Sequence, residues 1–131
     1  MSEKNISILI LDDEPIVAKR LQPALEKKGY QVESFTKSSQ ALERVREQKF
    51  DIVITDLKME GISGMEFLEK VKNLWPETEV IVITGFATME TAKESFKKGV
   101  FDFLAKPFKL SEIIEIVKKA EERIKRKKAP E

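Results

Sequence analysis

The chain has 131 residues, which suffices for one domain with its own core. It contains no cysteine and no histidine, which excludes disulfides, thiolate metal sites and a histidine base. Its 24 basic and 23 acidic residues nearly cancel, so no overall charge favours nucleic acid or a membrane surface. Any bound metal must have oxygen ligands, which favours Mg²⁺, Ca²⁺ or Mn²⁺.

The apolar runs are short. None approaches the roughly 20 residues that a membrane-spanning helix needs. Residues 1–5 lead into a strand-like run without the pattern of a signal peptide. We therefore expect a cytoplasmic protein that does not associate with a membrane.

Short apolar runs alternate along the chain with segments of helical period. The runs predict strands at residues 6–11, 31–35, 52–54, 80–83 and 100–104. The helical segments begin at or near Glu14, Ser38, Gly64, Thr88 and Ser111. Such alternation predicts an α/β fold of the doubly wound, flavodoxin-like (βα)5 kind, with a five-stranded parallel sheet covered by helices on both faces.

Three details of these elements can be checked. Pro23 lies inside the first helix and predicts a bend or a local loss of backbone hydrogen bonding. Ser38 and Ser39 are candidates to cap the second helix. Phe101 and Phe103 share one face of the last strand if its period of two includes both.

Residues with reactive or charged side chains follow the predicted strands at their carboxyl ends. They are Asp12, Asp13, Asp56, Thr84 and Lys106. Parallel strands place these ends at one edge of the sheet, so we expect the side chains to converge. The three carboxylates and one lysine leave a charge that one Mg²⁺ would neutralise. Without it, each carboxylate pair about 4 Å apart would cost on the order of 4 kcal/mol at an effective dielectric near 20.

Asp56 is the candidate nucleophile of this edge. A carboxylate is already ionised and attacks without a base, which suits a chain that lacks histidine. A metal ion and a lysine supply the positioning and charge neutralisation that phosphoryl transfer requires. The pattern therefore predicts that Asp56 accepts a phosphoryl group.

These residues, in this order and at these strand ends, resemble the receiver domain of bacterial two-component response regulators over about residues 5–125. The runs Thr84–Ala92 and Asp102–Phe108 are similar to the NtrC-type subgroup, whose full-length members carry an ATPase and a DNA-binding domain. The resemblance implies strand order 2-1-3-4-5, a receiver domain at 1–125, and a basic tail or the start of a linker at 126–131.

The resemblance also implies the metal ligands. Asp12, Asp13, Asp56 and the backbone carbonyl of Lys58 would hold Mg²⁺, with Mn²⁺ as a possible substitute. Asp56 would be the phosphoacceptor. Glu60 stands where many members carry proline, so the loop after Asp56 is expected to be less rigid.

The remaining roles concern phosphate binding and switching. Thr84 and Lys106 would bind the phosphoryl group, and Thr84 and Phe103 would be the switch residues. Phe103 lacks the tyrosine hydroxyl of some members. The Lys106-Pro107 peptide bond would be cis.

The implied function is a signalling switch and not an enzyme acting on other substrates, although the domain would promote its own phosphorylation and dephosphorylation. A sensor histidine kinase would be the phosphoryl donor. The surface of the fourth helix, fifth strand and fifth helix would be read by an output domain, a downstream protein or a second copy in a homodimer. We expect no direct nucleic-acid binding by this domain.

Other interpretations remain open at this point. Asp12 and Asp13 could cap the first helix, and the sequences after the fourth and fifth strands could be an ordinary turn and loop. The basic run near the end is typical of a solvated helix terminus, and less often of a nucleic-acid contact.

Three other functions compete with the switch. An aspartate-nucleophile phosphatase typically has a second acid two residues after the nucleophile, where this chain has Lys58. A receiver-like binding module would not need the full set of acids. A flavodoxin-like cofactor site would need a phosphate-binding loop after the first strand, where the acids Asp12, Asp13 and Glu14 repel phosphate.

Overall fold

The computed structural model describes residues 5–58 and 61–128. Its strands are β1 (Ser7–Leu11), β2 (Gln31–Phe35), β3 (Ile52–Thr55), β4 (Glu79–Thr84) and β5 (Asp102–Ala105). Its helices are α1 (Pro15–Lys27), α2 (Ser38–Glu47), α3 (Gly64–Leu74), α4 (Met89–Lys97) and α5 (Leu110–Lys128). The strands form one parallel sheet in the order β2-β1-β3-β4-β5, which confirms the predicted fold class.

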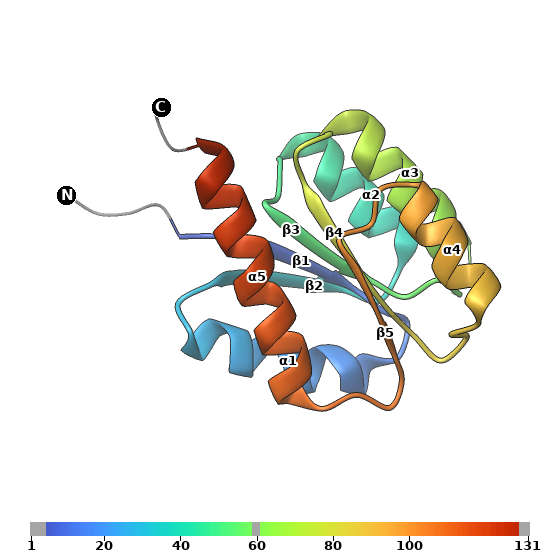
Figure 1. Ribbon diagram of the computed structural model, residues 1–131, viewed down its shortest axis with the longest axis horizontal. Coiled ribbons are helices and arrows are strands. Elements are labelled where there is room, and N and C mark those ends of the chain that lie inside the picture. The colour runs from blue at the N-terminus through green and yellow to red at the C-terminus, as the bar shows by residue number, and fades with distance from the viewer. Residues whose placement is uncertain (1–4, 59–60, 129–131) are drawn as a thin grey trace.

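Helices cover both faces of the sheet (Figure 1), with α1 and α5 on one face and α2, α3 and α4 on the other. Each face has its own apolar core. The core under α1 and α5 includes Ile8, Ile54 and Val117, and the core under α2 and α3 includes Leu9, Val53 and Phe67. Alternate residues of the central strands thus point into opposite cores, which is why these strands are apolar throughout.

Local sequence accounts for most helix ends. Pro15 is the first residue of α1, and Gly29 follows its end with a φ of 97° that favours glycine. Thr88 caps α4, where its hydroxyl accepts a hydrogen bond from the Thr91 amide at 3.0 Å. The helix α1 continues through Pro23, whose missing N–H removes one helical hydrogen bond, as predicted.

Two sequence predictions about local structure are wrong. Lys37, and not a serine, is the N-cap of α2, and the Ser38 hydroxyl instead accepts a hydrogen bond from the Ile62 amide at 3.2 Å. Phe101 and Phe103 do not share a face, because β5 begins only at Asp102. Phe101 packs against the core under α1 and α5, and Phe103 against the opposite core.

The end of the chain continues the last helix. The predicted boundary at residue 125 falls within α5, which extends to Lys128, so the first basic residues of the run form a helix end. Residues 129–131 lie outside the described part. None of the helices in the described ranges is both long and apolar enough to cross a membrane.

Candidate functional site

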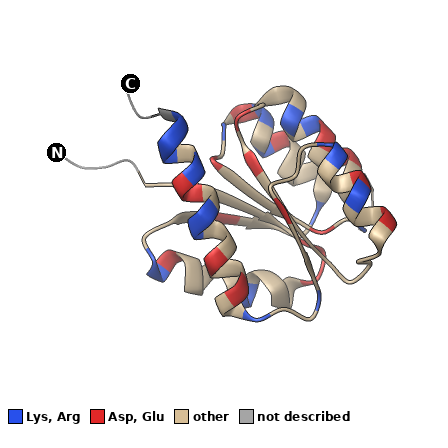
Figure 2. Cartoon of the chain, viewed as in Figure 1, with Lys and Arg blue, Asp and Glu red and all other residues tan. Residues whose placement is uncertain are grey.

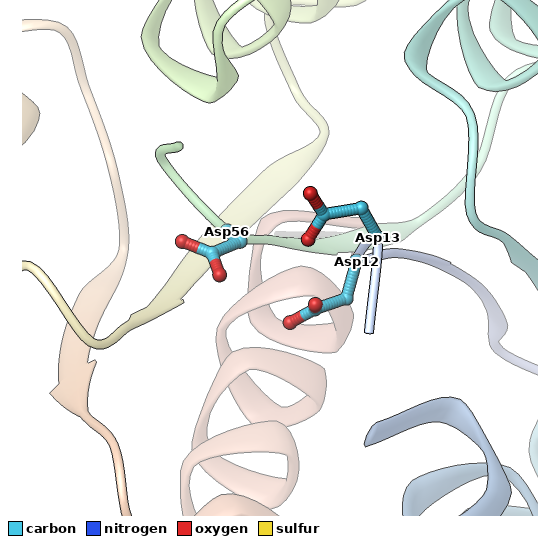
Figure 3. Close-up of side chains that lie close together, drawn as sticks. All are labelled: Asp12, Asp13 and Asp56. Carbon is cyan, nitrogen blue, oxygen red and sulfur yellow. The ribbon is translucent and has the colours of Figure 1, made fainter. Parts of the chain in front are cut away.

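Three aspartates meet where β1 and β3 end. The two strands are neighbours, and Leu11 pairs with Thr55, so the residues that follow them lie side by side. Asp12 and Asp56 are only 2% and 5% exposed, whereas Asp13 is exposed. One carboxylate oxygen from each aspartate lies within 4.8 Å of the other two (Figure 3). The predicted convergence is therefore present.

Lys106 reaches the aspartates from β5, on the far side of β4. Its Nζ atom lies 2.8 Å from Asp12 Oδ2, 2.8 Å from Asp56 Oδ2 and 2.6 Å from Glu14 Oε1. Burial lowers the pKa of Lys106, but its hydrogen bonds to the three carboxylates outweigh this effect and raise the pKa. Lys106 is therefore a cation at neutral pH. The peptide bond that follows it is cis, as the sequence predicted.

The two oxygens of Asp56 have different partners. Oδ1 accepts hydrogen bonds from the amides of Leu57 at 2.6 Å and Lys58 at 3.2 Å, and Oδ2 accepts one from Lys106. Backbone donors thus hold one oxygen in place. Among the described residues, the only hydrogen bond to the other oxygen comes from a side chain that can move.

Gly64 maintains the loop that supplies these amides. Its own amide donates to the Leu57 carbonyl at 2.8 Å. A Cβ atom at this position would lie 1.7 Å from the Asp56 carbonyl oxygen and 2.5 Å from the Leu57 Cα. Only glycine fits here without a shift of the loop.

Asp12 is a site residue and not a helix cap. Glu14 is the N-cap of α1, and its amide donates to Asp12 Oδ1 at 2.9 Å. Burial raises the pKa of Asp12 above its usual value, and the bond to Lys106 opposes that shift. The folded protein thus holds Asp12 in a place where its negative charge is stable only beside a cation.

Thr84 lies at the end of β4 and is fully buried. Its hydroxyl accepts a hydrogen bond from the Phe86 amide at 3.0 Å. Phe86 is half exposed, and the Lys58 Nζ atom lies 4.3 Å from the centre of its ring. These contacts connect the loop after β3 with the loop after β4.

The site opens to solvent through a pocket of about 420 Å³. Its walls are formed by Asp13, Glu14, Asp56, Lys58, Gly85, Phe86 and Lys106. Thr84 is absent from this lining, because its side chain is buried behind the pocket wall. Phe103 is half-buried against the core under α2 and α3, away from the three aspartates.

The charges of the site do not balance. Asp12, Asp13, Glu14 and Asp56 bring four carboxylates, and Lys106 and Lys58 bring two ammonium groups, so the net charge is −2. All ligand atoms offered by the three clustered aspartates are hard oxygens, the type that Mg²⁺ and Ca²⁺ prefer. The donor set therefore fits a divalent cation.

Two residues of the site were missed as such by sequence reasoning. Glu14 was assigned to the opening of α1 and to the acids that repel phosphate, but its contact with Lys106 was not predicted. Its position directly after the two aspartates was the available signal. For Phe86 the sequence contains no such signal, because nothing near it in the chain indicates a contact with Lys58. Glu60, at which a less rigid loop was predicted, lies outside the described residues.

Comparison with known proteins gives consistent matches. The family model of the response regulator receiver domain matches residues 8–118. The transcriptional regulatory protein ZraR of Escherichia coli K12 is 38% identical over 120 residues. That alignment covers 92% of this chain but only 27% of ZraR, so the chain spans about a quarter of the relative's length.

Two solved structures share the fold. A response regulator from Burkholderia pseudomallei, with a phosphorylated aspartic acid, calcium ion and citrate, has a TM-score of 0.81 and 28% identity, covering 95% of this chain and 74% of its own. The solution structure of the beryllofluoride-activated NtrC4 receiver domain dimer has a TM-score of 0.85 and 31% identity. The match covers 90% of this chain and 98% of the NtrC4 chain.

Proposed function

The chain belongs to the response regulator receiver family, and its relative ZraR is of the NtrC type, as the sequence predicted. On that basis we propose that it is a phosphorylation-activated switch of a two-component system in which Asp56 accepts the phosphoryl group. The observation that carries this proposal is the meeting of Asp12, Asp13 and Asp56 at one edge of the sheet, with Lys106 bonded to two of them.

The hydrogen-bond partners of Asp56 favour one of its two oxygens as the nucleophile in this proposal. Backbone amides hold Oδ1, so Oδ2 is the oxygen that forms the new O–P bond. The P–N bond of a phosphohistidine on a sensor kinase breaks in the same step, and the imidazole leaves with its electron pair. Lys106 then exchanges its bond to Oδ2 for a bond to a phosphate oxygen, which keeps its charge paired throughout.

The acids fit a metal ion, and in this proposal Asp12, Asp13, Asp56 and the Lys58 backbone carbonyl hold Mg²⁺, or Mn²⁺ in its place. When bound, the ion supplies the positive charge that lets a phosphoryl group approach four carboxylates. The Burkholderia pseudomallei structure, which combines a phosphorylated aspartic acid with a calcium ion, supports this pairing of metal and phosphate.

The switch depends on Thr84 and Phe103. Thr84 trades its hydrogen bond from the Phe86 amide for one to the phosphoryl group, and Phe103 moves into the space that Thr84 leaves. This changes the surface of α4, β5 and α5. Met89 and Phe96 lie seven residues apart on α4 and are 77% and 50% exposed, so apolar surface is available there for a partner.

That partner is an output domain, a downstream protein or a second copy of the chain. The dimeric NtrC4 receiver domain supports the last of these. In full-length relatives such as ZraR, sequence beyond this domain is available to respond.

The test is phosphorylation by acetyl phosphate, followed by the intact mass. The wild type with Mg²⁺ should gain one phosphoryl group, and the wild type with a chelator should gain none. Asp56→Asn should gain none under either condition, whereas Asp51→Asn, which alters the acid at the other end of β3, should behave as the wild type. Equal modification of the wild type and Asp56→Asn would refute the proposal.

A further inference from the structure

A third buried acid, after Asp12 and Asp56, lies at the opposite edge of the sheet. Glu79 is the first residue of β4 and is only 2% exposed. Its amide donates to the Asp51 carbonyl at 3.0 Å, which places it beside the start of β3. The proposed phosphorylation does not use this carboxylate, so its burial needs another explanation.

Two cations from α5 face Glu79. Its Oε2 atom lies 3.2 Å from Arg123 Nε and 3.5 Å from Lys127 Nζ. Within the described residues, no group donates a hydrogen bond to Oε2, so these contacts are ionic and not hydrogen bonds. A buried carboxylate with one oxygen that accepts no hydrogen bond depends on its cations, because removing them leaves an uncompensated charge.

Arg123 and Lys127 are four residues apart and therefore lie on one face of α5. Between them, Ile124 is 6% exposed and packs into the core. Arg123 also lies over the ring of Phe101, 5.6 Å from its centre, directly before β5. Figure 2 shows basic residues along this last part of α5.

Lys72 adds a third positive charge from α3. Its Nζ donates to the carbonyls of Pro76 and Thr78 at 2.9 and 3.0 Å. Burial lowers the pKa of Lys72, and the nearby charge of Glu79 opposes this shift. Lys72 is held by backbone carbonyls, so it cannot follow α5 if that helix moves.

We propose that Glu79, Arg123 and Lys127 form a latch that fixes the last two turns of α5 against the start of β4, and so sets the direction in which the end of this helix points. A segment or partner attached to that end is then presented at one defined angle. This inference is independent of phosphorylation, because the latch lies at the edge of the sheet opposite Asp56.

The absence of cysteine makes a direct distance measurement possible. Spin labels at Glu47→Cys and Arg126→Cys report the distance between the ends of α2 and α5. In the otherwise unchanged chain we expect one narrow distance distribution. Glu79→Gln should broaden it, and hydrogen exchange of the amides at 121–128 should become roughly tenfold faster, while exchange in β1 and β3 stays the same.

Matched variants separate the latch from general destabilisation. Glu77→Gln alters an exposed neighbour whose nearest cation, Lys49, is 3.8 Å away, and it should leave the distribution narrow. Arg123→Gln combined with Lys127→Gln should reproduce the effect of Glu79→Gln, and adding Glu79→Gln to that pair should change little more.

The two cations are half exposed, so their variant decides the outcome even if Glu79→Gln fails to fold. An unchanged distribution in the Arg123 and Lys127 variant would overturn the latch. So would equal broadening by Glu77→Gln. Modification of Glu79→Gln by acetyl phosphate at the wild-type rate is expected and keeps this test separate from that of the proposed function.

Discussion

The buried carboxylates at the two edges of the sheet have opposite electrostatic surroundings. At the carboxyl edge, Lys106 contacts three carboxylates and Asp13 adds a fourth nearby, so the net charge is negative. At the amino edge, a single buried carboxylate faces cations from two helices, and these cations retain contact with water. The buried carboxylate of the amino edge thus already has its cations, whereas the carboxyl edge has fewer cations than carboxylates and has a place for one more.

The difference indicates where ligand chemistry belongs in this fold. A buried carboxylate that already faces cations holds elements together, and an added cation gains little there. An excess of carboxylates is costly until a cation arrives, and the binding free energy of that cation includes the relief of repulsion. Substitutions at either edge can distinguish a ligand site from a structural contact.

Gly64→Ala is expected to have the largest effect on stability. The new Cβ would meet the Asp56 carbonyl at 1.7 Å, so the loop that holds Asp56 must shift. We expect a loss of about 3 kcal/mol in the free energy of unfolding, measured by urea denaturation. Gly85→Ala is the control, because a Cβ there has nothing within 4 Å. Similar losses for both variants would show that the loop contact is unimportant.

Lys106→Met should have the next largest effect. It leaves Asp12 and Asp56 buried without their shared cation, and should cost about 2 kcal/mol at pH 7. Mg²⁺ should recover part of this loss, so the rise in melting temperature on adding Mg²⁺ should be larger in the variant than in the wild type. A variant as stable as the wild type without metal would mean that the carboxyl edge is not short of positive charge.

Tyr30→Phe tests a contact of the amino edge and should have the smallest effect, about 1 kcal/mol. The Tyr30 hydroxyl donates to Glu121 on α5 at 2.6 Å. Burial raises the pKa of Tyr30, and the bond to Glu121 raises it further. The wild type should therefore lose stability as the pH rises above about 10, where the unfolded tyrosine ionises first.

Tyr30→Phe should not lose stability in this way. The difference in the free energy of unfolding between the wild type and Tyr30→Phe at pH 7 should therefore become smaller above pH 10. Tyr30 is the one tyrosine of the chain, and its ultraviolet absorbance reports the titration without interference from another phenol. Ionisation near pH 10 in the folded protein, or a deficit that does not vary with pH, would argue against the contact.

Sequence reasoning worked best at the carboxyl edge. The positions of Asp12, Asp56 and Lys106 follow from strand ends alone, because a parallel sheet places all such ends together. The strand order and the roles of the residues came from the family resemblance and not from periodicity. The assignment of Asp56 as phosphoacceptor stays a proposal until the modified residue is identified.

Sequence reasoning worked less well where contacts join residues that are far apart in the chain. Glu79 was left ahead of the predicted strand, and nothing in the sequence indicates that cations some 40 residues later would approach it. Phe101 and Phe103 were assigned to one face because the apolar run suggested a longer strand. Periodicity locates elements well but not their first residue, and the alternation of faces holds only for residues within the strand.

The most direct test of the account is the identity of the modified residue. After phosphorylation with Mg²⁺, borohydride reduction converts an aspartyl phosphate to homoserine, which tandem mass spectrometry can locate. The account predicts homoserine at position 56 and at no other aspartate. Homoserine at position 12 or 13, or an unmodified Asp56 in protein that has gained the mass of a phosphoryl group, would contradict it.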